Sequence, residues 1–143
     1  MTKKYRETIE QKIVIGFFCG LWWLLTLPFR GLRKNPKISL EEQKYIISKR
    51  REIESLKLSG KNIELKHAVM EADKLVDYIL KKKGFSGKTF ADRLLDSQKF
   101  FSPIVYNDIW QGHKIRNQLA HEDVEISSHK LREATDKLLG AIR

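Results

Sequence analysis

The chain has 143 residues, of which 41% are hydrophobic and 32% charged, with three prolines and one cysteine. This composition is typical of one small folded domain, and it excludes a disordered polymer, an internal disulfide framework and a multi-cysteine zinc site. The 28 lysines and arginines exceed the 18 acidic residues by ten, which favours polyanionic partners such as RNA or acidic lipid headgroups.

Residues 13–29, "IVIGFFCGLWWLLTLPF", form an apolar run of 17 residues without a charge. As a helix the run is about 25 Å long, which is within the range of membrane-spanning segments when flanking lysines and arginines reach the interface. We therefore expect a membrane helix over 13–29, preceded by a basic N-terminal tail over 1–12. A secretory signal peptide is not favoured, because "TLPFRGLRK" offers no small-residue cleavage site.

Two alternatives to a spanning helix stay open for this run. Trp22 and Trp23 lie near its middle, whereas aromatic belts lie at membrane interfaces, so a helix lying in the interface also fits. A buried core helix is the other alternative. Gly16 and Gly20 form a G-x-x-x-G pair, whose spacing lets two membrane helices approach closely and so favours a homodimer or higher homo-oligomer.

A strongly basic stretch follows the apolar run. Residues 30–38 form the predicted juxtamembrane linker, and they contain Arg30, Arg33, Lys34 and Lys37. From Ile38 onward 20 basic residues face 16 acidic ones, an excess of only four. Because positive charge concentrates on the inner side of membrane segments, we expect the C-terminal domain to be cytoplasmic.

Residues 39–143 are predicted to form the folded domain. "SLEE" begins a helix over 40–58, with Ser39 as the cap and Glu42 completing a capping box. That helix is poorly amphipathic, so we expect it on the surface of a bundle. Ser59 and Gly60 end it, and the next helix carries a clear apolar stripe with spacings of three and four: Leu65, Ala68, Val69, Ala72, Val76 and Ile79.

Three further helices complete the predicted domain. A short helix runs over 89–101 and is stopped by "Ser-Pro"; another is capped by Asn107 or Asp108 and runs to His121; the last follows Ser127 or Ser128. No stretch has the alternating apolar pattern of a strand. The predicted fold is therefore all-α, an antiparallel helical bundle with short connections.

The most informative stretch is "HKIRNQLAHE", residues 113–122. On a helical wheel Arg116, Asn117 and His113 lie in the same arc as apolar residues, and an arginine on a half-buried face usually has a partner or ligand. His121 lies 140° from Arg116 on an ideal wheel, so the two converge only at a helix end or across two subunits.

Arg116, Asn117 and His121 in "RNQLAH" resemble the motif of the HEPN family: an arginine, a polar residue, and a histidine four to six residues after the arginine, near the end of a helix. The resemblance covers the order of helices over roughly residues 60–143. It implies a small helical bundle that pairs as a dimer, and many members are metal-independent endoribonucleases. By resemblance, Arg116 and His121 are catalytic and Asn117 is an orienting polar group. His113 lies one helical turn before Arg116 and Asn117, so it is either an accessory in the same cleft or a packed helix histidine.

This chemistry is reasonable on physical grounds alone. RNA cleavage without a metal needs a base for the 2′-hydroxyl, an acid for the leaving 5′-oxygen, and a cation for the charged phosphorane. Histidine can serve as base or acid, and arginine presents a planar fork of donors to phosphate oxygens. Since one chain supplies one such histidine, a dimer cleft is the economical arrangement. RNA and the membrane are the expected partners.

Several departures leave a non-catalytic role open. Glu122 and Asp123 place negative charge beside the motif, and Asp123 occupies the position of the tyrosine found in family members that are neutralised by nucleotidylation. Arg116 could instead pair with Asp73 or Asp77, leaving a scaffold or pore-like membrane oligomer in which the motif serves the subunit interface. The spacing of His, Asp and Glu predicts no metal site, and no cofactor is expected.

Overall fold

The structure is a computed structural model that describes residues 37–121 and 125–142, all of them in one compact unit, Asn35–Arg143. The predicted tail, the membrane helix with its glycine pair and most of the basic linker lie outside the described residues. Within the described part, no helix combines the length and the apolar character needed to cross a membrane.

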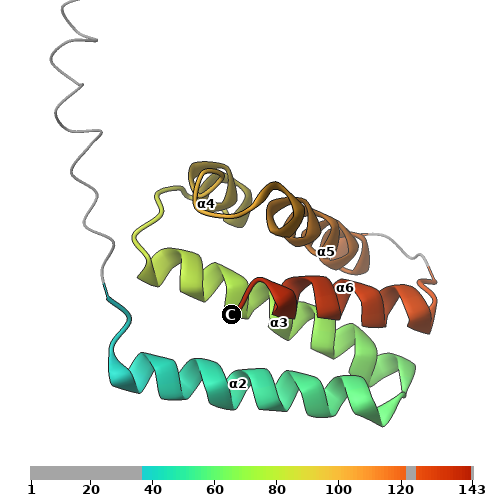
Figure 1. The fold of residues 1–143 in the computed structure, drawn as a ribbon. Coiled ribbons are helices and arrows are strands. Elements are labelled where there is room, and N and C mark those ends of the chain that lie inside the picture. The colour runs from blue at the N-terminus through green and yellow to red at the C-terminus, as the bar shows by residue number, and fades with distance from the viewer. Residues whose placement is uncertain (1–36, 122–124, 143) are drawn as a thin grey trace, which may run out of the picture. The chain divides into compact units, whose positions relative to one another are not determined.

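The described chain is a packed bundle of helices without strands (Figure 1). Its helices are α2 (Leu40–Ser59), α3 (Asn62–Lys82), α4 (Phe90–Asp96), α5 (Pro103–His121) and α6 (Ser128–Gly140). The helices α3 and α6 form a middle layer, with α2 on one side and α4 and α5 on the other. Ion pairs of Lys82 with Glu42 at 2.6 Å and of Lys49 with Glu71 at 3.8 Å show that α2 and α3 are antiparallel. The predicted all-α bundle is confirmed for these residues.

The helix ends follow the capping signals of the sequence. At the start of α2, the Glu42 amide donates to the Ser39 hydroxyl at 3.3 Å, and the Ser39 amide donates to the Glu42 carboxylate at 2.8 Å. Gly60 ends the helix with a φ of 76°, a left-handed conformation that favours glycine. Ser127 caps α6 by accepting from the Lys130 amide. These three capping predictions are confirmed.

Two boundaries around "Ser102-Pro103" differ from the prediction. Helix α4 ends at Asp96 and not near residue 101, and α5 begins at Pro103 and not at residue 107 or 108. Proline suits the first turn of a helix, because its fixed φ is helical and its missing N–H would have no helical partner there. Ser102 acts as the cap by accepting from the Val105 amide at 3.3 Å. Pro103 therefore begins a helix, whereas the sequence predicted that it would end the preceding one.

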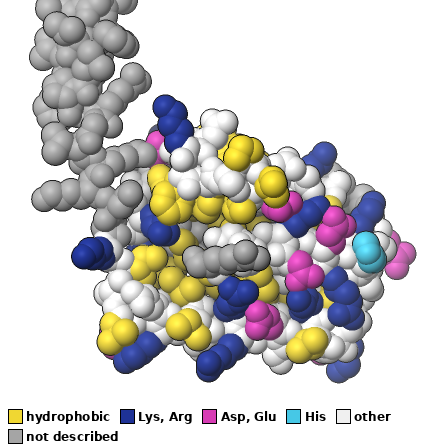
Figure 2. Space-filling model, viewed as in Figure 1, with side chains coloured by type: hydrophobic (Ala, Val, Ile, Leu, Met, Phe, Trp, Pro, Cys, Tyr) yellow, Lys and Arg dark blue, Asp and Glu magenta, His cyan; other side chains and the backbone are white. Residues whose placement is uncertain are grey.

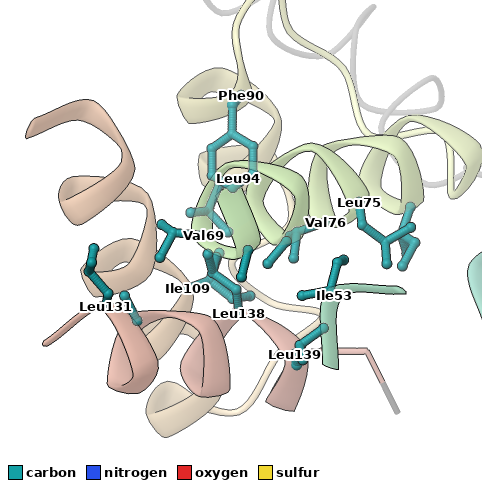
Figure 3. Packing of buried hydrophobic residues seen from close by; sticks show 14 of the residues in the cluster. Ile53, Val69, Leu75, Val76, Phe90, Leu94, Ile109, Leu131, Leu138 and Leu139 are labelled. Atoms are coloured by element: carbon teal, nitrogen blue, oxygen red, sulfur yellow. The ribbon is translucent and has the colours of Figure 1, made fainter. Parts of the chain in front are cut away.

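The hydrophobic core is built around α3, as its apolar stripe predicts. Its buried residues pack against Leu94 of α4, Ile109 of α5 and Leu138 of α6 (Figure 3). From α2 only Ile53 is buried, which agrees with the weak amphipathic pattern of that helix. All members of this core lie between residues 53 and 139, so the unit carries a complete core of its own.

Polar contacts hold much of α2 in place instead. The Arg50 guanidinium donates to the Ile142 carbonyl at 2.6 Å, and the Arg132 guanidinium donates to the Lys57 carbonyl at 2.9 Å. Lys57 also pairs with Asp136 of α6. The charged helix α2 is therefore held by polar side chains that bridge it to α6 and to the residues just after α6.

Helices α5 and α6 approach each other closely at Gly112. A Cβ added there would lie 2.5 Å from Cγ of Leu138, a fully buried residue, and 3.1 Å from the Ala134 carbonyl oxygen. We expect Gly112→Ala to lower the free energy of unfolding by about 2 kcal/mol, because the two helices must separate. Urea unfolding checks this, with Gly140→Ala as the matched control, since a Cβ at Gly140 meets nothing within 4 Å. Equal stability of the two variants would contradict the close approach.

Candidate functional site

A buried carboxylate and a buried histidine link α3 to α5. Asp73 of α3 and His113 of α5 have side chains only 6% and 10% exposed, and Oδ1 of Asp73 lies 2.8 Å from Nδ1 of His113. The His113 ring also stacks on Phe90 of α4, with centroids 4.1 Å apart and planes 15° from parallel. Three helices thus converge on His113 and hold its ring in one orientation.

The hydrogen-bond partners determine which nitrogen of His113 carries the hydrogen. Nη1 of Arg116 can only donate, and it donates to Oδ1 of Asn117 at 3.0 Å. The Asn117 amide nitrogen therefore faces Nε2 of His113, at 3.1 Å, and Nε2 must accept. The hydrogen is then on Nδ1, where it is donated to the Asp73 carboxylate. Both ring nitrogens of His113 are occupied by partners inside the protein.

Arg116 closes this chain of contacts back onto the same carboxylate. Its Nε lies 3.6 Å from Oδ2 of Asp73, an ion-pair distance, and its side chain is 32% exposed. The other candidate acid, Asp77, instead pairs with Arg93 at 2.7 Å and with Lys81 at 2.7 Å. Of the two alternatives that the sequence left open for Arg116, the structure supports Asp73.

A groove runs along the exposed side of this network. It has a volume of about 480 Å³, and every described residue that lines it belongs to α5: Trp110, Gln111, His113, Lys114, Asn117, Gln118 and His121. These residues recur at helical spacing, so the groove follows one face of the helix from its middle to its C-terminal end. It joins an aromatic ring, three side-chain amides, a lysine and an exposed histidine.

His121 lies at the C-terminal end of α5, where its side chain is exposed and lines the groove. Arg116 is not among the residues that line the groove, so a single copy of the chain does not place Arg116 and His121 together in it. Asn117 touches both parts, since it accepts from Arg116 and lines the groove. Glu122 and Asp123, which follow His121 in the sequence, lie outside the described residues.

Sequence reasoning missed the lining residues Trp110 and Lys114 and the direct bond between Asp73 and His113. A signal for the bond was present, because Asp73 is four residues after Val69 and therefore lies on the apolar stripe of α3. A carboxylate on a core-facing stripe needs a buried partner, and His113 is the polar residue on the core-facing side of α5. The pairing itself depends on how the two helices pack.

No protein-family model, curated protein or solved structure matches this chain. The resemblance to the HEPN family therefore rests on the motif residues and on the order of the helices.

Proposed function

We propose that this chain is a membrane-tethered, HEPN-like protein whose α5 groove binds single-stranded RNA, and which cleaves that RNA without a metal ion once two copies meet. The bundle would lie on the cytoplasmic side of the membrane. The observation that supports this best is the α5 groove itself, in which an exposed histidine, a lysine and an indole line one surface beside a rigid buried network.

The lining residues suit a nucleic acid strand. A base can stack on Trp110 whatever its identity, since every base has a π-face, and Lys114 can face a phosphate. Lys114 is exposed and forms no ion pair with any other described residue, so no described carboxylate competes with a phosphate for it. Side-chain amides at Gln111, Asn117 and Gln118 can bond to bases or to the ribose 2′-hydroxyl.

The proposed reaction is transesterification within the RNA. A base removes the proton of the 2′-hydroxyl, whose oxygen attacks the adjacent phosphorus, and an acid protonates the 5′-oxygen as its bond to phosphorus breaks. The products are a 2′,3′-cyclic phosphate and a 5′-hydroxyl. We assign proton transfer to His121, because both nitrogens of His113 already have partners. Arg116 would stabilise the charge on the phosphorane.

Two copies are needed on this proposal. In one chain, His121 is the single histidine of the groove whose ring nitrogens have no described partner, whereas the reaction needs both a base and an acid. The described wall of the groove comes from α5 alone, so a second copy could supply the opposite wall together with a second His121 and Arg116. Residues 13–29 would hold the two copies together in the membrane.

Lys114 offers a test of binding that is separate from cleavage. We expect Lys114→Gln to weaken single-stranded RNA binding several-fold and to reduce the salt dependence of affinity by about one counterion, because one phosphate contact is lost. Fluorescence anisotropy over a salt series measures both quantities. The matched control is Arg51→Gln. Arg51 is exposed, forms no ion pair with another described residue, and lies on α2, a helix that does not contact α5. If the salt dependence of affinity is unchanged in Lys114→Gln, the result contradicts RNA binding in the groove.

A second candidate function has its own supporting observation. Arg116 already faces the Asp73 carboxylate, and an arginine held in this way can serve to hold a helix surface in shape for a subunit interface. The chain would then be a non-catalytic membrane scaffold or pore-like oligomer. The two candidates separate in a metal-free cleavage assay on the assembled protein: cutting supports the ribonuclease, and intact RNA with an assembled oligomer supports the scaffold.

A further inference from the structure

The end of the bundle where α3 meets α4 exposes apolar side chains. Leu95 is 57% exposed, Phe100 45% and Ile104 76%. The Phe100 ring packs edge-on against Phe85, with centroids 5.5 Å apart, so this contact fixes the position of the partly exposed ring. Figure 2 shows hydrophobic side chains gathered over this region, with lysine and arginine side chains around them.

Positive charge collects at the same end. Over residues 77–100 six lysines and arginines face three aspartates, so this stretch holds three of the four excess charges that follow Ile38. Lys81 and Lys82 are paired with carboxylates, whereas Lys83, Lys88 and Lys99 form no ion pair with another described residue. The apolar residues and these lysines together make up the lysine–aromatic surface: Lys83, Lys88, Leu95, Lys99, Phe100 and Ile104.

Two contacts tie together the chain segments that carry this surface. The Lys83 ammonium lies 4.7 Å from the centroid of the Phe100 ring, which ties the end of α3 to the turn after α4. The Ser86 amide donates to the Asp96 carboxylate at 2.7 Å, which ties the loop before α4 to the end of that helix. Of its six residues, four lie between helices, whereas Leu95 lies in α4 and Ile104 lies in the first turn of α5.

The chain also enters the domain at this end. Helix α2 begins beside the last turn of α3, as the ion pair between Glu42 and Lys82 and the left side of Figure 1 both show. In the sequence, the residues just before α2 include Arg30, Arg33, Lys34 and Lys37. The described chain therefore begins at the end of the domain that carries the lysine–aromatic surface.

We infer that the lysine–aromatic surface binds an acidic lipid surface, so that the bundle lies directly against the membrane that tethers it. Lysines near an anionic bilayer each contribute about 1 kcal/mol, and apolar side chains between them can enter the headgroup region. Nucleic acid fits less well, because the aliphatic Leu95 and Ile104 offer no face on which a base can stack. Lipid binding here is independent of RNA cleavage.

The test uses residues 35–143, which contain the complete core and lack the apolar run, with circular dichroism to confirm that each variant folds. We expect this fragment to sediment with vesicles of phosphatidylcholine containing about one third phosphatidylserine, and not with phosphatidylcholine alone. Added salt should release it, because the exposed charges are screened. Absence of binding to the acidic vesicles overturns the inference.

Two variants distinguish a specific surface from general basic charge. Replacing Lys83, Lys88 and Lys99 with glutamine should lower vesicle binding on the order of 100-fold. Replacing Leu95 and Ile104 with serine, at unchanged charge, should lower it by about 10-fold. The charge-matched control replaces three cations elsewhere that form no ion pair with another described residue, and it should change binding by less than about three-fold: Arg51→Gln, Lys66→Gln and Lys130→Gln.

Equal losses in the two triple variants would show that net charge alone drives binding, and would overturn the inference. So would full binding by Leu95→Ser with Ile104→Ser. If the fragment does not bind vesicles but the variant of Lys83, Lys88 and Lys99 loses affinity for RNA, the surface binds nucleic acid and the inference is overturned. Because the cleavage assay is read separately, a failure here leaves the ribonuclease proposal standing, and the reverse also holds.

Discussion

Replacing His121 with alanine is expected to lower RNA cleavage by about a thousand-fold while leaving RNA binding within a few-fold of the unmodified protein. His121 is exposed, lines the α5 groove and has no described hydrogen-bond partner, so its loss removes a proton-transfer group without removing a packing contact. The measurement is cutting of a labelled single-stranded RNA by the full chain in detergent, with a chelator present. The product should end in a 2′,3′-cyclic phosphate.

The matched control for this variant is His129→Ala. His129 is an exposed histidine on α6, outside the groove, and cleavage should be unchanged when it is lost. Full activity of His121→Ala, or an equal loss in both variants, would refute the role of His121. A chain that assembles but never cuts RNA would refute catalysis and favour the scaffold.

The second large effect is expected at Asp73. Asp73→Ala should lower the free energy of unfolding by about 1 to 3 kcal/mol, because a buried hydrogen-bond donor is left without its acceptor. His113 would lose the acceptor of its Nδ1 hydrogen, and Arg116 would lose its carboxylate. Urea unfolding of the fragment 35–143 measures the difference.

Two comparisons sharpen this prediction. Asp136→Ala breaks an ion pair of α6 with Lys57 in which the aspartate is 58% exposed, and it should cost less than about 1 kcal/mol. Asp73→Asn keeps an oxygen that can accept from His113 but removes the charge, so its stability should fall between those of Asp73→Ala and the unmodified domain. If Asp73→Ala is no less stable than Asp136→Ala, the buried network does not hold α3 to α5.

The apolar patterns were enough to predict the main elements of the fold. The stripe of α3 identified the central helix, and Ser39, Gly60 and Ser127 marked helix ends, because capping and periodicity are local properties. The boundary between α4 and α5 could not be read in the same way. Proline is compatible with a helix start and with a helix end, and the capping contact to Ser102 decided between them.

Much less of the candidate site was predictable. The sequence alone identifies the motif residues Arg116, Asn117 and His121. It does not show that Arg116 belongs to a buried network while His121 lines an open groove. His113 could be read from the sequence either as an accessory to the cleft or as a packed histidine, and its ring both packs between Asp73 and Phe90 and lines the groove. The lysine–aromatic surface could not be predicted either, because its members come from α4, from α5 and from the segments between helices, and they share no periodic pattern.

By itself the sequence determined the all-α class, the helix count after residue 39 and the polar residues of α5, since these depend on contacts within a few residues along the chain. Only the tertiary structure decided that Asp73, and not Asp77, takes Arg116, and that His113 is held by hydrogen bonds at both nitrogens. The physical reason is that both aspartates lie on α3, one turn apart. Which of them is buried beneath α5 depends on how the two helices pack against each other.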